Sequence, residues 1–96
     1  MDELIQEFAS EISDADGHVY TARAMGRQRK ARTMWEGWLE FAPTRGRGIV
    51  GRSQIETTQP NREALAYWAS GIEPVYLEGA LERAIASRSD RPARSR

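Results

Sequence analysis

The sequence MWEGWLEFA, at residues 34–42, decides the fold. In an extended chain, successive side chains point to opposite faces. One face of this stretch then holds Trp35, Gly37, Leu39 and Phe41, and the other holds Glu36, Trp38 and Glu40. The period of two, in a stretch rich in aromatic residues, predicts a β-strand with one buried face.

Two further strands are predicted, one on each side of this stretch. Residues 18–25 are rich in β-branched and aromatic side chains, and residues 49–57 alternate between apolar and polar positions. The connections, residues 26–33 and 43–48, are short and carry basic residues and glycine. We therefore expect a three-stranded antiparallel β-meander. Its two loops lie at opposite ends of the sheet, roughly 23 Å apart for strands of about seven residues.

Helical periodicity is found before and after the predicted strands. Residues 2–12 place Leu4, Ile5, Phe8 and Ile12 at helical spacing, which predicts a short N-terminal helix. Pro60 starts a second helix, with a buried stripe of Ala64, Leu65, Tyr67, Trp68 and Ile72. A third helix starts near Pro74, with an apolar face of Val75, Leu77, Leu81, Ala84 and Ile85. The predicted fold class is α+β: the meander packs against the two C-terminal helices, with the short helix before it.

The length of 96 residues and the composition limit the organisation of the chain. We expect one small α+β domain at residues 1–86 and a disordered basic tail at residues 87–96, where serine and arginine predominate. No apolar run approaches the roughly 18 residues that cross a bilayer, and the first residues are acidic, unlike a signal peptide. The expectation is a cytoplasmic protein without membrane contact.

Residues able to support catalysis or hold a cofactor are few. The chain has no cysteine and one histidine, His18, which excludes thiolate chemistry and a metal site built from two histidines of one chain. His18 follows Asp16 closely, but no nucleophile stands at a recognisable spacing. Residues 46–51 spell GxGxxG within a hairpin turn, whereas phosphate binding requires that motif between a strand and a helix. We therefore expect no enzymatic activity and no cofactor.

The formal net charge of zero conceals charged blocks. Residues 1–16 are acidic and residues 23–52 are mainly basic. The topology places the first hairpin loop beside the start of the second helix, where free N–H groups favour anions. The candidate anion or nucleic-acid contacts there are Arg27, Arg29, Lys30, Arg32, Thr58, Asn61 and Arg62. In the simpler alternative, Thr58 or Asn61 only caps the helix and the basic loop is solvated.

Trp38 is the candidate protein contact. It lies between two glutamates, on the face opposite the apolar side of its strand. Either the N-terminal helix or a second copy covers it, or it is exposed and stacks on bases; we favour burial against protein. The sequence thus predicts a non-enzymatic interaction module that binds a protein partner or forms a homo-oligomer. The alternative function is nucleic-acid or phosphate binding through the basic loop and the adjacent helix N-terminus.

Overall fold

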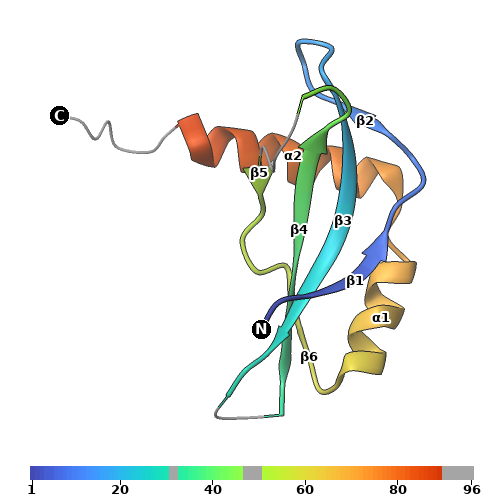
Figure 1. Ribbon diagram of the computed structural model, residues 1–96, viewed down its shortest axis with the longest axis vertical. Helices are drawn as coiled ribbons and strands as arrows, with labels where there is room; N and C mark the ends of the chain where they lie inside the picture. Colours follow the sequence, from blue (N-terminus) through green and yellow to red (C-terminus); the bar gives the residue numbers. More distant parts are fainter. Residues whose placement is uncertain (31–32, 47–50, 90–96) are drawn as a thin grey trace, which may run out of the picture.

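The computed structural model describes residues 1–30, 33–46 and 51–89, as one antiparallel sheet with two helices on one of its faces (Figure 1). The elements in chain order are β1 (Glu3–Glu7), β2 (Ile12–Ser13), β3 (Val19–Gln28), β4 (Trp35–Pro43), β5 (Gly51–Arg52), β6 (Thr57–Gln59), α1 (Arg62–Ser70) and α2 (Pro74–Ser89). The α+β class and the two C-terminal helices are confirmed. The sheet has six strands, so the prediction of three strands is wrong.

A long hairpin of β3 and β4 forms the centre of the sheet. The two strands pair from Tyr20 opposite Pro43 to Gln28 opposite Trp35. β1 and β2 pair with β3, and β5 and β6 pair with β4, always antiparallel. The strand predicted from residues 34–42 is therefore confirmed as a central strand, with neighbours on both sides.

The predicted N-terminal helix is wrong, because residues 3–7 and 12–13 are strands. β1 pairs with β3, and an irregularity between Leu4 and Gln6 inserts one extra residue into β1. The insertion breaks the strict alternation of the strand, so its apolar residues acquire a spacing that resembles that of a helix. A helix this short is only marginally stable alone, whereas the edge of β3 offers backbone hydrogen bonds and burial for Ile12.

The described part of the third predicted strand, residues 49–57, contains β5 and only the first residue of β6, which continues to Gln59. Between them residues 53–56 leave the regular ladder, and Ser53 Oγ accepts the N–H of Leu39 at 2.9 Å. This detour brings Glu56 to the helix side, where it pairs with Arg83 of α2. Glu56 therefore does not share a face with Glu36 and Glu40, which pair with arginines of β3. Residues 47–50, which end the predicted loop and begin the predicted strand, lie outside the described residues.

The hydrophobic core lies between the sheet and the two helices (Figure 1). Its largest fully buried side chains are Phe41, Leu39, Leu65, Leu77 and Leu81. Of the two caps that the sequence allows, Thr58 and Asn61, the structure has Asn61, which accepts the N–H of Ala64 at 2.7 Å. No helix among the described residues is long and apolar enough to cross a membrane.

α2 extends further than the sequence predicts. It continues to Ser89, beyond residue 86 at which the predicted domain ends. Residues 87–89 are therefore helical, although the sequence assigns them to the disordered tail. The rest of that predicted tail, residues 90–96, lies outside the described residues.

Two glycines set the distance between α1 and the sheet. Gly26 of β3 and Gly37 of β4 lie directly opposite each other, and Leu65 of α1 packs against both. A Cβ atom on Gly26 would lie 2.4 Å from Leu65 Cδ2, and one on Gly37 would lie 2.5 Å from Leu65 Cδ1. Real carbon atoms do not approach so closely without displacement, because attraction between them is optimal at about 3.5–4.0 Å. Leu65 can therefore occupy this position only because residues 26 and 37 are glycines without side chains.

Candidate functional site

The predicted anion site lies at the end of the sheet where β3 and β4 are joined. Nη1 of Arg27 lies 3.7 Å from Asp2 Oδ1, and its Nη2 lies 3.4 Å from Glu36 Oε1. Nε of Arg29 lies 3.6 Å from the other carboxylate oxygen of Glu36. Because the N-terminal segment is a strand beside β3, its acidic residues lie at this end of the sheet. They balance the basic charge on which the anion prediction depends.

The helix N-terminus predicted to share this site lies at the same end of the sheet. Nε of Arg62 donates to Glu3 Oε1 at 3.0 Å, so this arginine also has a carboxylate partner. Asn61 acts as the cap of α1. Thr58 lies opposite Glu36 in the pairing of β4 with β6. The predicted residues are thus brought near one another, but most of their charge and hydrogen-bonding capacity is already used.

Lys30 differs from these residues, because it forms no ion pair with any other described residue. It lines a shallow pocket of about 540 Å³ together with Arg29 and Thr33. Glu3 lines the same pocket, which places a carboxylate where an anion would bind. Arg32, the remaining candidate, lies outside the described residues.

Trp38 lies on the sheet face opposite the helices and is nevertheless 0% exposed. The guanidinium carbon of Arg52 lies 4.2 Å from the centre of its ring, and that of Arg27 lies 5.1 Å away. The indole N–H donates to Glu40 Oε2 at 3.1 Å. Arginine side chains of the same chain therefore bury the ring, by cation–π stacking and by covering it with their stems. Neither a helix nor a second copy is needed to cover it, and no ring face is open for stacking on bases.

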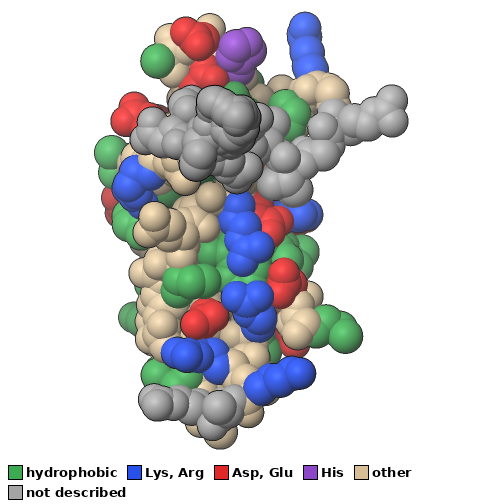
Figure 2. Space-filling view, turned by 90° about the vertical axis from the view of Figure 1, so that its left-hand side faces the viewer, with side chains coloured by type: hydrophobic (Ala, Val, Ile, Leu, Met, Phe, Trp, Pro, Cys, Tyr) green, Lys and Arg blue, Asp and Glu red, His purple; other side chains and the backbone are tan. Residues whose placement is uncertain are grey.

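Two arginines beside Trp38 pair with glutamates of the neighbouring strand. Arg23 donates to Glu40 Oε1 from Nε at 3.2 Å and from Nη2 at 3.0 Å, and Arg27 pairs with Glu36 as described above. Figure 2 shows basic and acidic side chains interspersed over the side of the molecule that it displays, rather than gathered into one basic patch. Such interspersed charges give a weak net field, and therefore a weak attraction for a polyanion.

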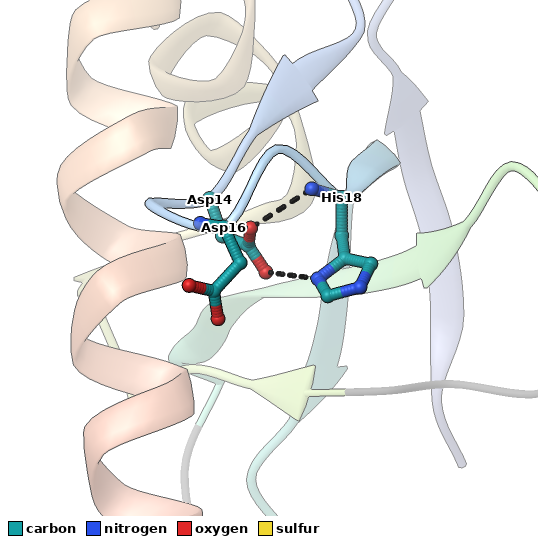
Figure 3. A group of neighbouring side chains, drawn as sticks. All are labelled: Asp14, Asp16 and His18. Atoms are coloured by element: carbon teal, nitrogen blue, oxygen red, sulfur yellow. Dashed lines mark hydrogen bonds and ion pairs between the residues drawn. The ribbon is translucent and has the colours of Figure 1, made fainter.

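At the opposite end of the sheet, Asp14, Asp16 and His18 lie together in a turn (Figure 3). These three are the described residues whose possible metal-ligand atoms lie within 4.8 Å of one another. Asp14 Oδ1 accepts the backbone N–H groups of Asp16 and His18 at 2.9 and 3.0 Å. Its Oδ2 accepts the hydroxyl of Tyr20 at 2.8 Å and lies 3.3 Å from His18 Nδ1. These bonds define the turn between β2 and β3, and we assign the cluster to that structural role.

The pKa of Asp14 is lowered by these hydrogen bonds. Desolvation raises the pKa, but the bonds from Tyr20, His18 and Asp16 outweigh it and hold the pKa below its ordinary value of 3.8. A carboxyl with a depressed pKa in the folded state stabilises the fold above its unfolded-state pKa. This stabilisation is lost as the pH falls through the folded-state pKa. The turn is therefore stabilised at neutral pH and weakened by acid.

Replacing Tyr20 with phenylalanine is expected to raise the pKa of Asp14 toward 3.8, because it removes the strongest of these donors. A carbon-detected NMR titration of the Asp14 carboxyl measures that shift. Urea unfolding at several pH values should show a stability difference between the two proteins that narrows as the pH falls through the pKa of Asp14. Tyr76→Phe, at a distant tyrosine, is the control and should leave Asp14 unchanged. An unchanged pKa in Tyr20→Phe would contradict the assignment.

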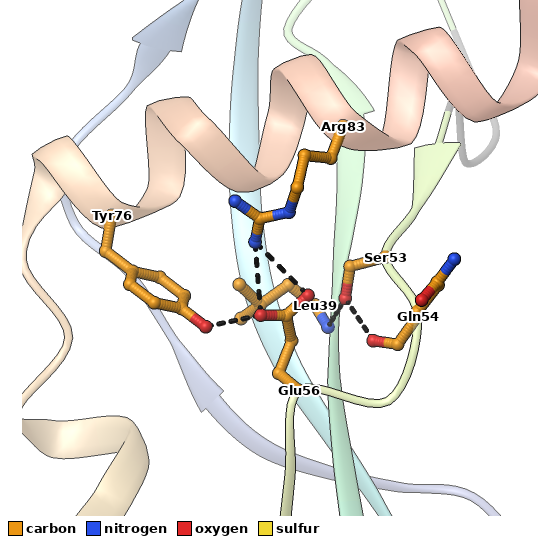
Figure 4. A network of polar contacts seen from close by, with 6 residues as sticks. All are labelled: Leu39, Ser53, Gln54, Glu56, Tyr76 and Arg83. Atoms are coloured by element: carbon orange, nitrogen blue, oxygen red, sulfur yellow. Dashed lines mark hydrogen bonds and ion pairs between the residues drawn. The ribbon is translucent and has the colours of Figure 1, made fainter.

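A second polar cluster ties the segment between β5 and β6 to α2 (Figure 4). The carboxylate of Glu56 accepts the hydroxyl of Tyr76, and Nη2 of Arg83 donates to its two oxygens at 3.1 and 3.3 Å. Burial raises the pKa of Tyr76, and the contact with Glu56 raises it further, while Arg83 opposes the shift. The cluster therefore fixes the ring of Tyr76 at the start of α2.

Near Tyr76, large apolar side chains face solvent at the junction of the two helices. We name this surface the aromatic corner and define it as Tyr67, Trp68, Ile72, Val75 and Tyr76. Tyr67 is 82% exposed and Val75 is 71% exposed. The five residues line a shallow pocket of about 570 Å³. The corner thus combines three aromatic and two aliphatic side chains from the two helices and the turn between them.

The sequence prediction missed this surface, because it assigned Tyr67 and Val75 to buried stripes. Leu65 and Ala69 are the buried residues of α1, and Leu77, Ala80, Leu81 and Ala84 are those of α2. Tyr67 lies two residues from Leu65 and from Ala69, on the opposite side of α1. The spacing of the most apolar residues therefore holds a signal that Tyr67 is exposed.

Comparisons of the chain with protein-family models, with curated proteins and with solved structures found no match. Two surfaces of the described residues then differ in what they offer a partner. The open sheet face around Trp38 holds the ion pairs Arg23–Glu40 and Arg27–Glu36, and arginines cover its largest ring. The aromatic corner leaves Tyr67 and Val75 largely exposed beside the half-buried Trp68 and Ile72.

Proposed function

We propose that this chain is a non-enzymatic interaction module that binds another protein through the aromatic corner. The observation that carries the proposal is that Tyr67 and Val75, both largely exposed, line one pocket. Single exposed apolar residues are common, but contiguous apolar patches mark interaction sites. Tyrosine and tryptophan are also enriched among the residues that contribute most to protein binding.

The corner is held in place before any partner arrives, which supports the same function. Tyr76 is fixed by its bond to Glu56, and the half-buried Trp68 and Ile72 pack against the core. Side chains that are ordered in the free protein lose less conformational entropy on binding. The corner therefore has the rigid anchors that efficient protein recognition requires.

Two other functions have less support. Phosphate or nucleic-acid binding depends on Arg27, Arg29 and Arg62, each of which pairs with a carboxylate. Lys30 is the described basic candidate that has no ion pair. Self-association through Trp38 loses its main argument because arginines of the same chain already cover the ring. A second copy remains one of the possible partners of the corner.

Selection from a random peptide library tests the proposal. Peptides selected on the native chain are expected to bind the Tyr67→Ser, Val75→Ser variant at least about tenfold more weakly, because truncation of a central aromatic contact such as Tyr67 commonly costs about 2 kcal/mol or more. The control variant, Leu4→Ser, Ile55→Ser, removes two other exposed apolar side chains and should bind as the native chain does. Peptides that do not distinguish the corner variant from the native chain would contradict the proposal. Sedimentation of the same proteins shows whether a second copy occupies the corner.

A further inference from the structure

The edge of the aromatic corner is acidic. Glu73 lines the pocket itself. Glu63 precedes Tyr67 by one turn of α1, and Glu78 and Glu82 follow Val75 by about one and two turns of α2. We name these residues the acidic rim and define it as Glu63, Glu73, Glu78 and Glu82. All four are exposed, and none forms an ion pair or a side-chain hydrogen bond with another described residue.

Three acidic residues on the sheet side of the molecule are arranged differently. Asp2, Glu36 and Glu40 each pair with an arginine of β3. The described arginine side chains of the helices do not compensate the rim, because Arg62 pairs with Glu3 and Arg83 with Glu56. Asp2, Glu36 and Glu40 thus have a cationic partner, whereas the four carboxylates of the rim have none among the described residues, so a negative charge remains around the corner. A surface of this kind attracts a cationic partner and repels an anionic one.

We infer that the aromatic corner selects a basic polypeptide segment, in which lysine or arginine side chains flank a large apolar residue. This inference rests on the proposed function of the corner as a protein-binding surface. The apolar residue would enter the pocket between Tyr67 and Val75, and the flanking cations would face the acidic rim. Arginine suits the flanking positions because its guanidinium pairs with carboxylates in a bidentate geometry and also stacks on tyrosine rings.

The rim also argues for a foreign segment rather than a second copy. A two-fold interface brings the same surface patch of both copies together. Two acidic rims would then face each other, and like charges across an interface lower the affinity. A nucleic acid would meet the same repulsion, because its backbone is negative. The occupant that the rim favours is therefore a cationic protein segment.

Two short synthetic peptides test the inference by amide NMR titration of the full chain. Both carry one central tryptophan, which is flanked by arginines in one peptide and by glutamates in the other. The arginine peptide is expected to shift the amides of residues 67–76, and its affinity should fall as ionic strength rises. Glu73→Gln, Glu78→Gln, Glu82→Gln should weaken it about tenfold, as expected for three exposed charge pairs. The glutamate peptide should leave these amides unshifted.

A matched control separates the rim from net charge. Glu7→Gln, Glu11→Gln, Asp16→Asn removes three exposed acidic groups away from the corner and should leave the affinity for the arginine peptide unchanged. Equal binding of the two peptides, or equal losses in the rim and control variants, would overturn the charge selectivity while leaving the corner as a binding surface. If neither peptide nor any selected peptide is sensitive to Tyr67→Ser, Val75→Ser, the proposed function fails together with the inference.

Discussion

Replacing Trp38 with alanine is expected to lower the free energy of unfolding by about 3–5 kcal/mol. The indole ring is fully buried, so its removal leaves a cavity that the rigid strands β3 and β4 cannot close. The change also removes the donor to Glu40 and the ring on which Arg27 and Arg52 stack. For a domain of this size such a loss is a large part of the total stability, which is commonly about 5–15 kcal/mol. Equilibrium unfolding in urea measures it.

Two matched variants test the origin of this effect. Trp35→Ala removes the same side chain from the same strand, where it is only half-buried, and should cost clearly less. Trp38→Phe keeps an aromatic ring beneath the two guanidinium groups but loses the bond to Glu40, and should lie between the native chain and Trp38→Ala. If Trp38→Ala costs no more than Trp35→Ala, the arginine cover over the ring does not exist in solution.

The arginines that cover Trp38 could not be predicted from the sequence alone. The alternation at residues 34–42 correctly places Trp38 opposite the apolar face, because strand period is a local property. Which side chains lie above the ring depends on the register between strands. Arg27 and Arg52 lie 11 and 14 residues away from Trp38 in the chain. These sequence separations do not indicate that either arginine contacts the ring.

The candidate anion site likewise combines features that local sequence predicts with contacts that it does not. Topology correctly brings the first hairpin loop and the start of α1 to one end of the sheet, and the Asn61 cap is readable from local sequence. The charge balance at that end depends on the N-terminal strand, whose irregularity after Leu4 conceals its period. Once Asp2 and Glu3 lie beside the arginines, the site is largely neutralised.

The aromatic corner was missed for a different reason. A helix with more apolar residues than its buried stripe can hold must expose some of them, and the sheet decides which. The opposed glycines of β3 and β4 leave space for Leu65 of α1. The helix therefore packs its Leu65 side against the sheet, and Tyr67 on the other side faces solvent. The orientation of α1, and with it the candidate binding surface, therefore follows from a packing detail between three elements.

Replacing both Gly26 and Gly37 with alanine is accordingly expected to destabilise the protein by about 2–4 kcal/mol. Each new Cβ would overlap a terminal methyl group of Leu65, and overpacking of this kind costs about 1–3 kcal/mol per site. Alanine also restricts the unfolded chain, which offsets about 0.4–1 kcal/mol per site, so the steric term decides the sign. Gly79→Ala in α2 is the control, since its nearest contact is 3.5 Å away and helix propensity should make it neutral or stabilising.

A double-mutant cycle with Leu65→Ala identifies the clash as the cause. In the native background Leu65→Ala should cost about 2–5 kcal/mol, because it empties a fully buried site. In the Gly26→Ala, Gly37→Ala background the same truncation removes the overlapping methyl groups, so it should cost less, with a coupling of about 1–3 kcal/mol. Additive costs would mean that α1 accommodates both new methyl groups by moving away from the sheet. The peptide selected on the aromatic corner then provides a second readout, because a shift of α1 displaces Tyr67 relative to Val75 and weakens binding.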